Sequence, residues 1–144
     1  FQTLLGLETL SLRMKKHVSN ARKIANWLEQ HPKIDKVTYA GLKSSKYYDL
    51  AKSVLPKGAG ALFTISLKEG YEACIKMINK LNLFSHVSNL GDTRSLIIHP
   101  ASTVHRQLTE QQQINAGLAP NVIRLSIGIE DPKDLIDDLK QALE

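Results

Sequence analysis

Arg124 is the residue whose type and setting most strongly indicate chemistry in this chain. It stands within the apolar segment V-I-R-L-S-I-G, residues 122–128. Alternate side chains of a strand share a face, so Arg124 would point away from the face that Ile123 occupies. A buried charge needs a partner, and the planar guanidinium matches a carboxylate with two parallel hydrogen bonds. The residue therefore predicts a bound anion, an internal salt bridge to Asp92 or Glu130, or a strand face open to water.

Asn89 is the second candidate, in the segment S-N-L-G-D-T-R-S-L-I-I-H-P-A-S-T, residues 88–103. The composition of Asn-Leu-Gly-Asp predicts a turn, where backbone and side-chain donors can face a small anion. Asparagine is also common in turns that bind nothing, so both interpretations of Asn89 stay open. From residue chemistry alone, the sequence indicates a small-anion site at a sheet edge.

Other reactive side chains lack the spacing that a catalytic or metal site requires. His99 and His105 are six residues apart, and no cysteine or acidic pair completes a metal site. Ser102 and Thr103 have no base at a diagnostic spacing. The glycines of segment 57–60 precede a strand rather than a helix, unlike a phosphate-binding loop. Cys74 lies on the apolar side of a predicted helix and is interpreted as a core residue.

The composition is typical of one globular domain. The chain has 144 residues, of which 42% are hydrophobic and 23% charged. The single cysteine excludes an internal disulfide and, with no apolar run long enough to span a membrane, favours a cytoplasmic protein. The net charge of +5 would permit a nucleic-acid partner. However, the basic residues are dispersed, their densest cluster lies on one predicted helix, and aromatic residues make up only 6%, so no nucleic-acid binding is expected.

Residues 1–30 are predicted to form one long amphipathic helix that ends before His31-Pro32. Its apolar residues recur at steps of three and four: Leu7, Leu10, Met14, Val18, Ala21, Ala25 and Leu28. A helix of ~30 residues would be about 45 Å long, more than so small a domain usually needs. Because it also starts without a capping residue, we expect the chain to be part of a larger protein.

The remaining segments alternate between strand and helix patterns. Strands are predicted at 36–39, 60–67, 84–87, 94–98 and 121–128, and helices at 45–54, 71–81, 109–117 and from Asp131 onward. A Thr-x-x-Gln capping box at Thr109 and the pair Asp131-Pro132 mark two helix starts. This order predicts an α+β fold, a two-layer sandwich with a small, mostly antiparallel sheet and helices on one face.

Long motifs of the chain resemble one enzyme family. The segment from Ser88 to His105, together with G-L-A-P-N-V-I-R-L-S-I-G-I-E-D at 117–131, is similar to the C-terminal signature of the cystathionine γ-synthase-like enzymes of Cys/Met metabolism. The segments G-L-E-T-L-S-L-R-M-K-K-H at 6–17 and L-P-K-G-A-G-A-L at 55–62 extend the similarity over the whole chain. These are fold-type I pyridoxal-phosphate proteins, and the resemblance implies their C-terminal small domain.

Within this family the chain looks most like the O-acetylhomoserine sulfhydrylase branch. Asn89 before L-G-D supports that branch, whereas Val104 departs from it because a second threonine is usual there. The resemblance implies a transferase that converts O-acetyl-L-homoserine and sulfide to L-homocysteine and acetate, with methanethiol giving methionine in some relatives. It also implies that Arg124 holds the substrate α-carboxylate, assisted by Asn89 and the adjacent backbone.

The same resemblance implies that catalytic and cofactor-binding residues lie outside this chain. In the family, the lysine that binds pyridoxal 5'-phosphate covalently, its phosphate-binding loop and its stacking tyrosine belong to a larger N-terminal domain. Residues 1–144 are thus expected to be a small domain that is inactive alone and binds neither cofactor nor metal. The resemblance also implies that the full-length protein is a homotetramer.

Two further classes of function stay open at this stage. The first is the activity of another branch of the family: cystathionine γ-synthase, O-succinylhomoserine sulfhydrylase or methionine γ-lyase. The other is a stand-alone regulatory module that binds an amino acid, because a small α+β sandwich can hold a carboxylate without catalysis.

Overall fold

The computed structural model describes residues 1–144, apart from the side chain of Glu110. Its elements, in chain order, are α1 (Gln2–Glu8), α2 (Leu10–Glu29), β1 (Ile34–Thr38), α3 (Tyr48–Val54), β2 (Leu62–Leu67), α4 (Tyr71–Lys80), β3 (Ser85–His86), β4 (Leu96–Ile98), the 3-10 helix η1 (Pro100–Ser102), α5 (Glu110–Asn115), β5 (Val122–Ser126) and α6 (Pro132–Leu143). The order of strands and helices agrees with the prediction, except that two helices, α1 and α2, replace the single predicted helix 1–30 and that η1 was not predicted.

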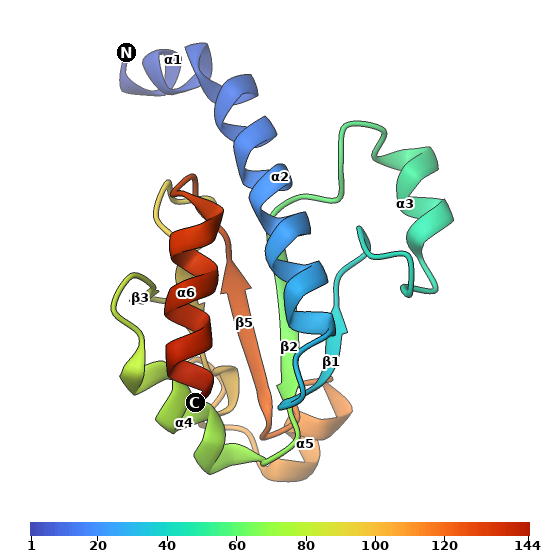
Figure 1. Ribbon diagram of the computed structural model, residues 1–144, viewed down its shortest axis with the longest axis vertical. Coiled ribbons are helices and arrows are strands. Elements are labelled where there is room, and N and C mark those ends of the chain that lie inside the picture. The colour runs from blue at the N-terminus through green and yellow to red at the C-terminus, as the bar shows by residue number, and fades with distance from the viewer.

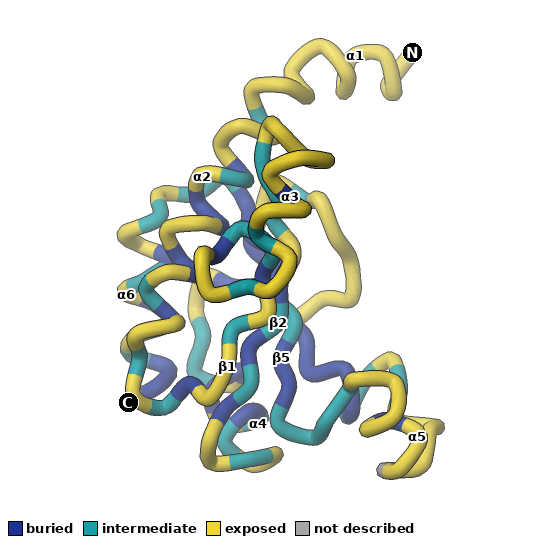
Figure 2. The backbone as a smooth tube through the Cα atoms, turned by 90° about the vertical axis from the view of Figure 1, so that its right-hand side faces the viewer, coloured by how far each residue is buried: buried dark blue, intermediate teal, exposed yellow. Residues whose placement is uncertain are grey.

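The strands form one sheet in the order β1-β2-β5-β4-β3. The β1–β2, β2–β5 and β4–β5 pairs are antiparallel, and only the short β3–β4 pair is parallel. Helices α2, α4 and α6 pack on one face of this sheet, while α5 lies on the other side (Figures 1 and 2). The predicted α+β sandwich with a mostly antiparallel sheet is therefore confirmed.

The core fills the layer between the sheet and the three helices. Its strand residues come from alternate positions, as the period of two requires. The fully buried large side chains include Ile24 and Leu28 of α2, Ile65 of β2, Ile123 and Leu125 of β5, and Leu135 and Leu139 of α6. Burying each such side chain stabilises the fold by roughly 1.5–3 kcal/mol relative to leaving it in water.

The prediction of one helix over residues 1–30 is wrong, because the helix breaks at Thr9. Thr9 has φ −104° and ψ 3°, outside the helical region, and α1 projects at an angle from α2 (Figure 1). The guanidinium of Arg13 donates to the Gly6 carbonyl and to the Thr9 hydroxyl. Arg13 thus satisfies the Gly6 carbonyl, a backbone oxygen that a continuous helix would have used internally, and also the Thr9 hydroxyl.

The predicted apolar stripe of this region is buried only in its second half. Ala21, Ala25 and Leu28 are completely covered, whereas Leu7 and Met14 are 55% and 40% exposed. The periodicity identified the apolar face of α2 correctly, but the sheet of this chain reaches only part of that face.

Both predicted helix starts are present. Thr109 and Gln112 form a reciprocal capping box at α5, and the Asp131 side chain accepts the Lys133 amide at 2.8 Å, ahead of Pro132. None of the helices described here combines the length and apolar composition that a membrane crossing requires.

Candidate functional site

β5 places Arg124 on the face of the sheet that α2, α4 and α6 leave uncovered. Ile123, Leu125 and Ile127 are fully buried in the core, so Val122, Arg124 and Ser126 point to the opposite face. The register puts Arg124 in one row across four strands, between Thr64 of β2 and Ile98 of β4, with Thr38 beyond Thr64. The alternation predicted from V-I-R-L-S is therefore present.

The segment that contains Asn89 comes to this face. Arg124 donates from Nη2 to the Asn89 carbonyl at 3.4 Å, and the Gly91 amide donates to the Ser126 hydroxyl oxygen at 3.3 Å. Gly91 has φ +73°, in the left-handed region that glycine adopts at low cost. The structure thus brings together the two residues that sequence reasoning selected, Arg124 and Asn89.

Asn89 meets Arg124 through its backbone rather than its side chain. Its Oδ1 accepts the Leu90 amide at 2.9 Å, which closes a local turn, and the residue is exposed. The carbonyl bond to Arg124 is long and leaves most of the five guanidinium donors for another partner. An anion approaching this face would meet that fork together with the exposed residues 89–91.

The two carboxylates considered as salt-bridge partners of Arg124 are engaged elsewhere. Glu130 accepts the Ser95 amide at 2.6 Å and the Ser95 hydroxyl at 2.9 Å. Asp92 accepts the Arg94 amide at 3.0 Å within its own turn. Arg124 is half-buried, so the geometry favours an external anion or water over an internal ion pair.

Glu130 and Ser95 fix the end of β5, a role that sequence reasoning assigned to neither residue. The Ser95 hydroxyl also accepts the Gly128 amide at 2.9 Å, and a Cβ at Gly128 would collide with the Thr93 carbonyl. On the helix side, Asn20 of α2 donates to the carbonyls of Gly128 and Glu130. These partners are 33 or more residues apart in the chain, so no local spacing could have revealed them.

His99 is enclosed and holds a turn together. Its Nε2 lies 2.6 Å from the Pro120 carbonyl and its Nδ1 2.8 Å from the Ser102 hydroxyl. A carbonyl can only accept, so Nε2 donates to Pro120, and Nδ1 lies within hydrogen-bond distance of the Ser102 hydroxyl. The structure places a base beside Ser102 that spacing did not indicate, but the completely buried ring joins η1 to the Pro120 segment rather than facing a substrate.

Cys74 has a structural role, and no metal cluster accompanies the histidines among the side chains that the structure describes. Cys74 is fully buried, and burial raises the pKa of its thiol to about 12, so its prediction as a core residue is confirmed. Apart from the side chain of Glu110, residues 1–144 contain no group of three or more His, Cys, Asp or Glu residues that could hold a metal ion.

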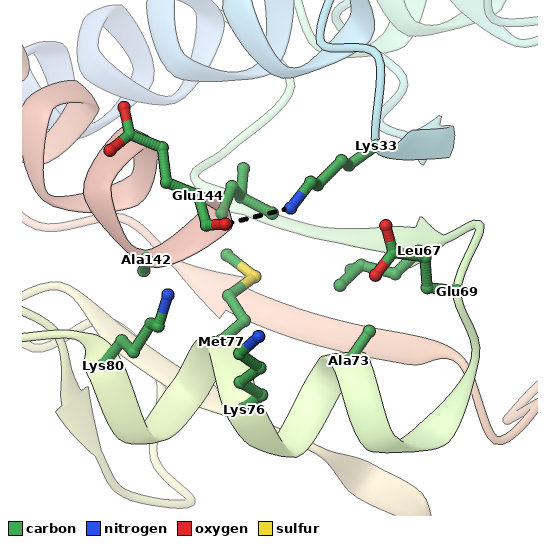
Figure 3. Close-up of a pocket in the computed structure, with 10 residues that line it drawn as sticks. Lys33, Leu67, Glu69, Ala73, Lys76, Met77, Lys80, Ala142 and Glu144 are labelled. Atoms are coloured by element: carbon green, nitrogen blue, oxygen red, sulfur yellow. Dashed lines mark hydrogen bonds between the residues drawn. The ribbon is translucent and has the colours of Figure 1, made fainter.

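Two hollows lie away from Arg124. A cavity of about 30 Å³ between α4 and the C-terminal end of α6 is rimmed by Lys33, Lys76 and Lys80 (Figure 3). Lys33 donates there to the Glu144 carbonyl at 3.3 Å, and the space suits about one water molecule rather than an amino acid. A larger groove of about 1030 Å³ runs between α2 and segment 55–60, with Met14, Val18, Leu55 and Ala59 among its lining residues.

Known proteins similar to this chain carry names from one area of metabolism. An O-acetyl-L-homoserine sulfhydrylase from Thermus thermophilus is 47% identical over 97% of this chain and 33% of its own length. An L-methionine gamma-lyase from Fusobacterium nucleatum is 42% identical over the full chain and 36% of its own length.

A solved structure agrees with these sequence relatives. It is described as an O-acetylhomoserine (thiol)-lyase from Campylobacter jejuni with pyridoxyl-lysine monophosphate. It superposes with a TM-score of 0.91 at 48% identity, covering 97% of this chain and 33% of that one. The chain therefore spans about a third of the length of the proteins it matches.

The profile of one protein family matches residues 1–144 in full. Its description, Cys/Met metabolism PLP-dependent enzyme, agrees with the motifs around Asn89 and Arg124 and with the similarity in fold. The chain belongs to the Cys/Met metabolism PLP-dependent enzyme family.

Proposed function

We propose that this chain supplies the substrate α-carboxylate site of a transferase that converts O-acetyl-L-homoserine and sulfide to L-homocysteine and acetate. One observation carries the proposal. The fork of Arg124 stands on the uncovered face of β5 with one long bond to the Asn89 carbonyl, while Glu130 and Asp92 are engaged elsewhere. The sulfhydrylase names among relatives that match nearly the whole chain support the choice of reaction.

The residues of this chain fit the substrate better than the cofactor. Pyridoxal phosphate needs a lysine amine for its aldehyde and a cradle for its phosphate. The strand lysine on the face of Arg124 is Lys36 of β1, two strands away, and the glycines of segment 57–60 lead into a strand. We therefore assign cofactor binding to the residues of the longer protein outside this chain.

Arg124 would contribute by positioning. When bound, the cofactor supplies an electron sink for the substrate's α-carbon. A bidentate bond between the guanidinium and the α-carboxylate would fix the orientation of the substrate and hence of its Cα–H bond. In the overall reaction, the C–O bond to acetate breaks at the γ-carbon, a C–S bond forms there, and one sulfide proton leaves with acetate.

The assembly that follows from this proposal has several parts. A cofactor-binding N-terminal domain of the same polypeptide would complete the site, the full-length protein would form a homotetramer, and it would act in the cytoplasm. We expect the 144-residue chain alone to be inactive and to bind no pyridoxal phosphate.

The test is a substitution of Arg124 in the full-length holoenzyme. Arg124→Ala should lower kcat/KM for O-acetylhomoserine by about 100- to 1000-fold, with unchanged cofactor absorbance, because a charge-assisted fork contact is lost. The kcat/KM of Arg124→Lys should lie between those of the unaltered enzyme and Arg124→Ala, since an ammonium keeps the charge but cannot form the paired bonds. Arg106→Ala, which changes an exposed arginine outside the site, is the matched control. An unchanged kcat/KM for Arg124→Ala would refute the carboxylate role.

Methionine gamma-lyase activity is the second candidate, because relatives with that name are 40–42% identical to this chain. The same Arg124 could hold the carboxylate of methionine. Release of methanethiol from methionine without sulfide, faster than sulfhydrylation of O-acetylhomoserine, would favour the lyase.

Tight calorimetric binding of O-acetylhomoserine or methionine to the isolated chain would instead favour a regulatory module.

A further inference from the structure

Ser126 is a polar residue in an apolar position of the uncovered sheet face. It is 4% exposed, and its cross-strand partners are Leu62 of β2 and Leu96 of β4. A hydroxyl buried between two leucines is costly unless it forms a hydrogen bond. The Gly91 amide provides that bond, donating to the hydroxyl oxygen at 3.3 Å.

Ser126 and Arg124 hold the same short segment at two points. Side chains two residues apart on a strand lie about 6.5–7 Å apart on one face. The segment is likewise contacted at residues two apart, the Asn89 carbonyl and the Gly91 amide. Residues 89–91 therefore lie along β5, and Arg124 and Ser126 set their position relative to the strand.

The two contacts differ in what a ligand would do to them. A carboxylate that takes the Arg124 fork would compete with the 3.4 Å bond to the Asn89 carbonyl. The bond between Gly91 and Ser126 uses no guanidinium donor and can persist. Asn89, Leu90 and Gly91 are exposed, and the bond from the Leu90 amide to the Asn89 side chain lies within the segment itself. The Ser126 contact would thus hold the segment in place when Arg124 turns to the substrate.

We propose that Ser126 is a positioning residue for the substrate carboxylate, resting on the proposed role of Arg124. Its hydroxyl anchors the Gly91 amide and so keeps the backbone of residues 89–91 beside the guanidinium. Ser126 does not itself touch the substrate. Loss of the anchor would let the segment move and would weaken binding of a ligand with an α-carboxylate, while leaving the chemistry of the bound substrate unchanged.

The experiment compares the two substrates of the full-length holoenzyme. Ser126→Ala should raise KM for O-acetylhomoserine about three- to tenfold, the range expected for one lost hydrogen bond, with kcat within twofold. KM for sulfide, which has no carboxylate, should stay constant. Ser126→Thr keeps the hydroxyl and should restore the KM. Ser66→Ala is the matched control, because Ser66 lies on the same face beside Val122 and its hydroxyl has no hydrogen-bond partner among the described residues.

The outcomes separate this inference from the proposed function. If Arg124→Ala raises KM for O-acetylhomoserine but Ser126→Ala does not, the positioning role is wrong and the carboxylate site stands. If neither variant changes KM or kcat/KM for O-acetylhomoserine, the proposed function itself fails. Equal changes in kcat and in both KM values would indicate general structural damage and would also overturn the positioning role.

A measurement on the unaltered holoenzyme keeps the inference testable if Ser126→Ala does not fold. Hydrogen exchange of the Gly91 amide should be at least tenfold slower than that of an unstructured amide, because the amide is hydrogen-bonded. O-acetylhomoserine should preserve that protection. Exchange of Gly91 at the unstructured rate would overturn the proposal.

Discussion

Successive side chains of β5 point to opposite faces of the sheet, and the two faces differ in what surrounds them. On one face Ile123, Leu125 and Ile127 are fully buried under α2, α4 and α6. On the other, Arg124 and Ser126 are contacted by the backbone of residues 89–91. The helix-covered face is closed by side chains of this chain, whereas on the other face Ser126 is buried and the half-buried Arg124 presents guanidinium donors to an approaching ligand.

If Arg124 has the proposed role, this difference should separate stability from function within one strand. A packed apolar layer loses contacts when a side chain is shortened, and the cost appears as a lower free energy of unfolding. A half-buried arginine on an uncovered face contributes little packing, and its loss would appear in ligand binding. Substitutions on the helix-covered face should therefore lower mainly the free energy of unfolding, and substitution of Arg124 should weaken mainly ligand binding.

The largest effect on stability is expected on the helix-covered face. Ile123→Ala should lower the free energy of unfolding of this chain by about 3 kcal/mol, because a fully buried side chain leaves a cavity beneath the helices. Urea denaturation followed by circular dichroism measures the change. Ile123→Val, which removes one methylene, is the control and should cost about 1 kcal/mol. A loss below 1 kcal/mol for Ile123→Ala would show that this face is not tightly packed.

A smaller effect on the free energy of unfolding is expected for a buried polar residue in one of the helices that cover the sheet. Asp138 of α6 is buried, and its carboxylate accepts the backbone amides of Asn82 at 3.0 Å and Leu83 at 2.8 Å. Asp138→Ala would leave these donors unpaired and should cost about 2 kcal/mol.

The same denaturation experiment tests Asp138→Ala. Asp137→Ala, one position earlier in α6, is the matched control for removing a carboxylate from this helix. Equal stability of the two variants would contradict the assignment of Asp138 as the acceptor that fixes the α4–β3 connection.

The smallest effect is expected on the uncovered face. Thr64 is the β2 partner of Arg124 and is only half-buried. Thr64→Ala should lower the free energy of unfolding by less than about 1 kcal/mol, the span of strand preferences. A cost as large as that of Ile123→Ala would remove the distinction between the two faces.

Most of the fold could be predicted from the sequence because it depends on local signals. The alternation in L-F-T-I-S-L and V-I-R-L-S identified β2 and β5, and Thr109 and Asp131 marked helix starts correctly. The break at Thr9 could not be predicted, because Arg13 stabilises it through contacts that exist only once the helix has bent. The exposure of Leu7 and Met14 was likewise unpredictable, since periodicity identifies an apolar face but not what covers it.

The candidate site could be predicted in part. Arg124 is evident because a lone charge in an apolar strand needs a partner, and Asn89 because a turn offers donors. Ser126 could have been found from the same alternation, since it shares a face with Arg124 two residues away. Its contact with Gly91 spans 35 residues, and only the strand order β5-β4 and the return of segment 88–92 bring the two together.

The shape of the sheet's outer strands has a consequence for self-association. An unpaired strand edge can template pairing with another copy and start aggregation. Here β1, at one edge, has a register irregularity between Ile34 and Lys36 and exposes the charged Asp35 and Lys36, while β3, at the other edge, is only two residues long. A bulged, charged edge and a very short one offer a poor template. The edges of the sheet therefore disfavour edge-to-edge assembly into fibres, even though α2, α4 and α6 cover only one face of the sheet.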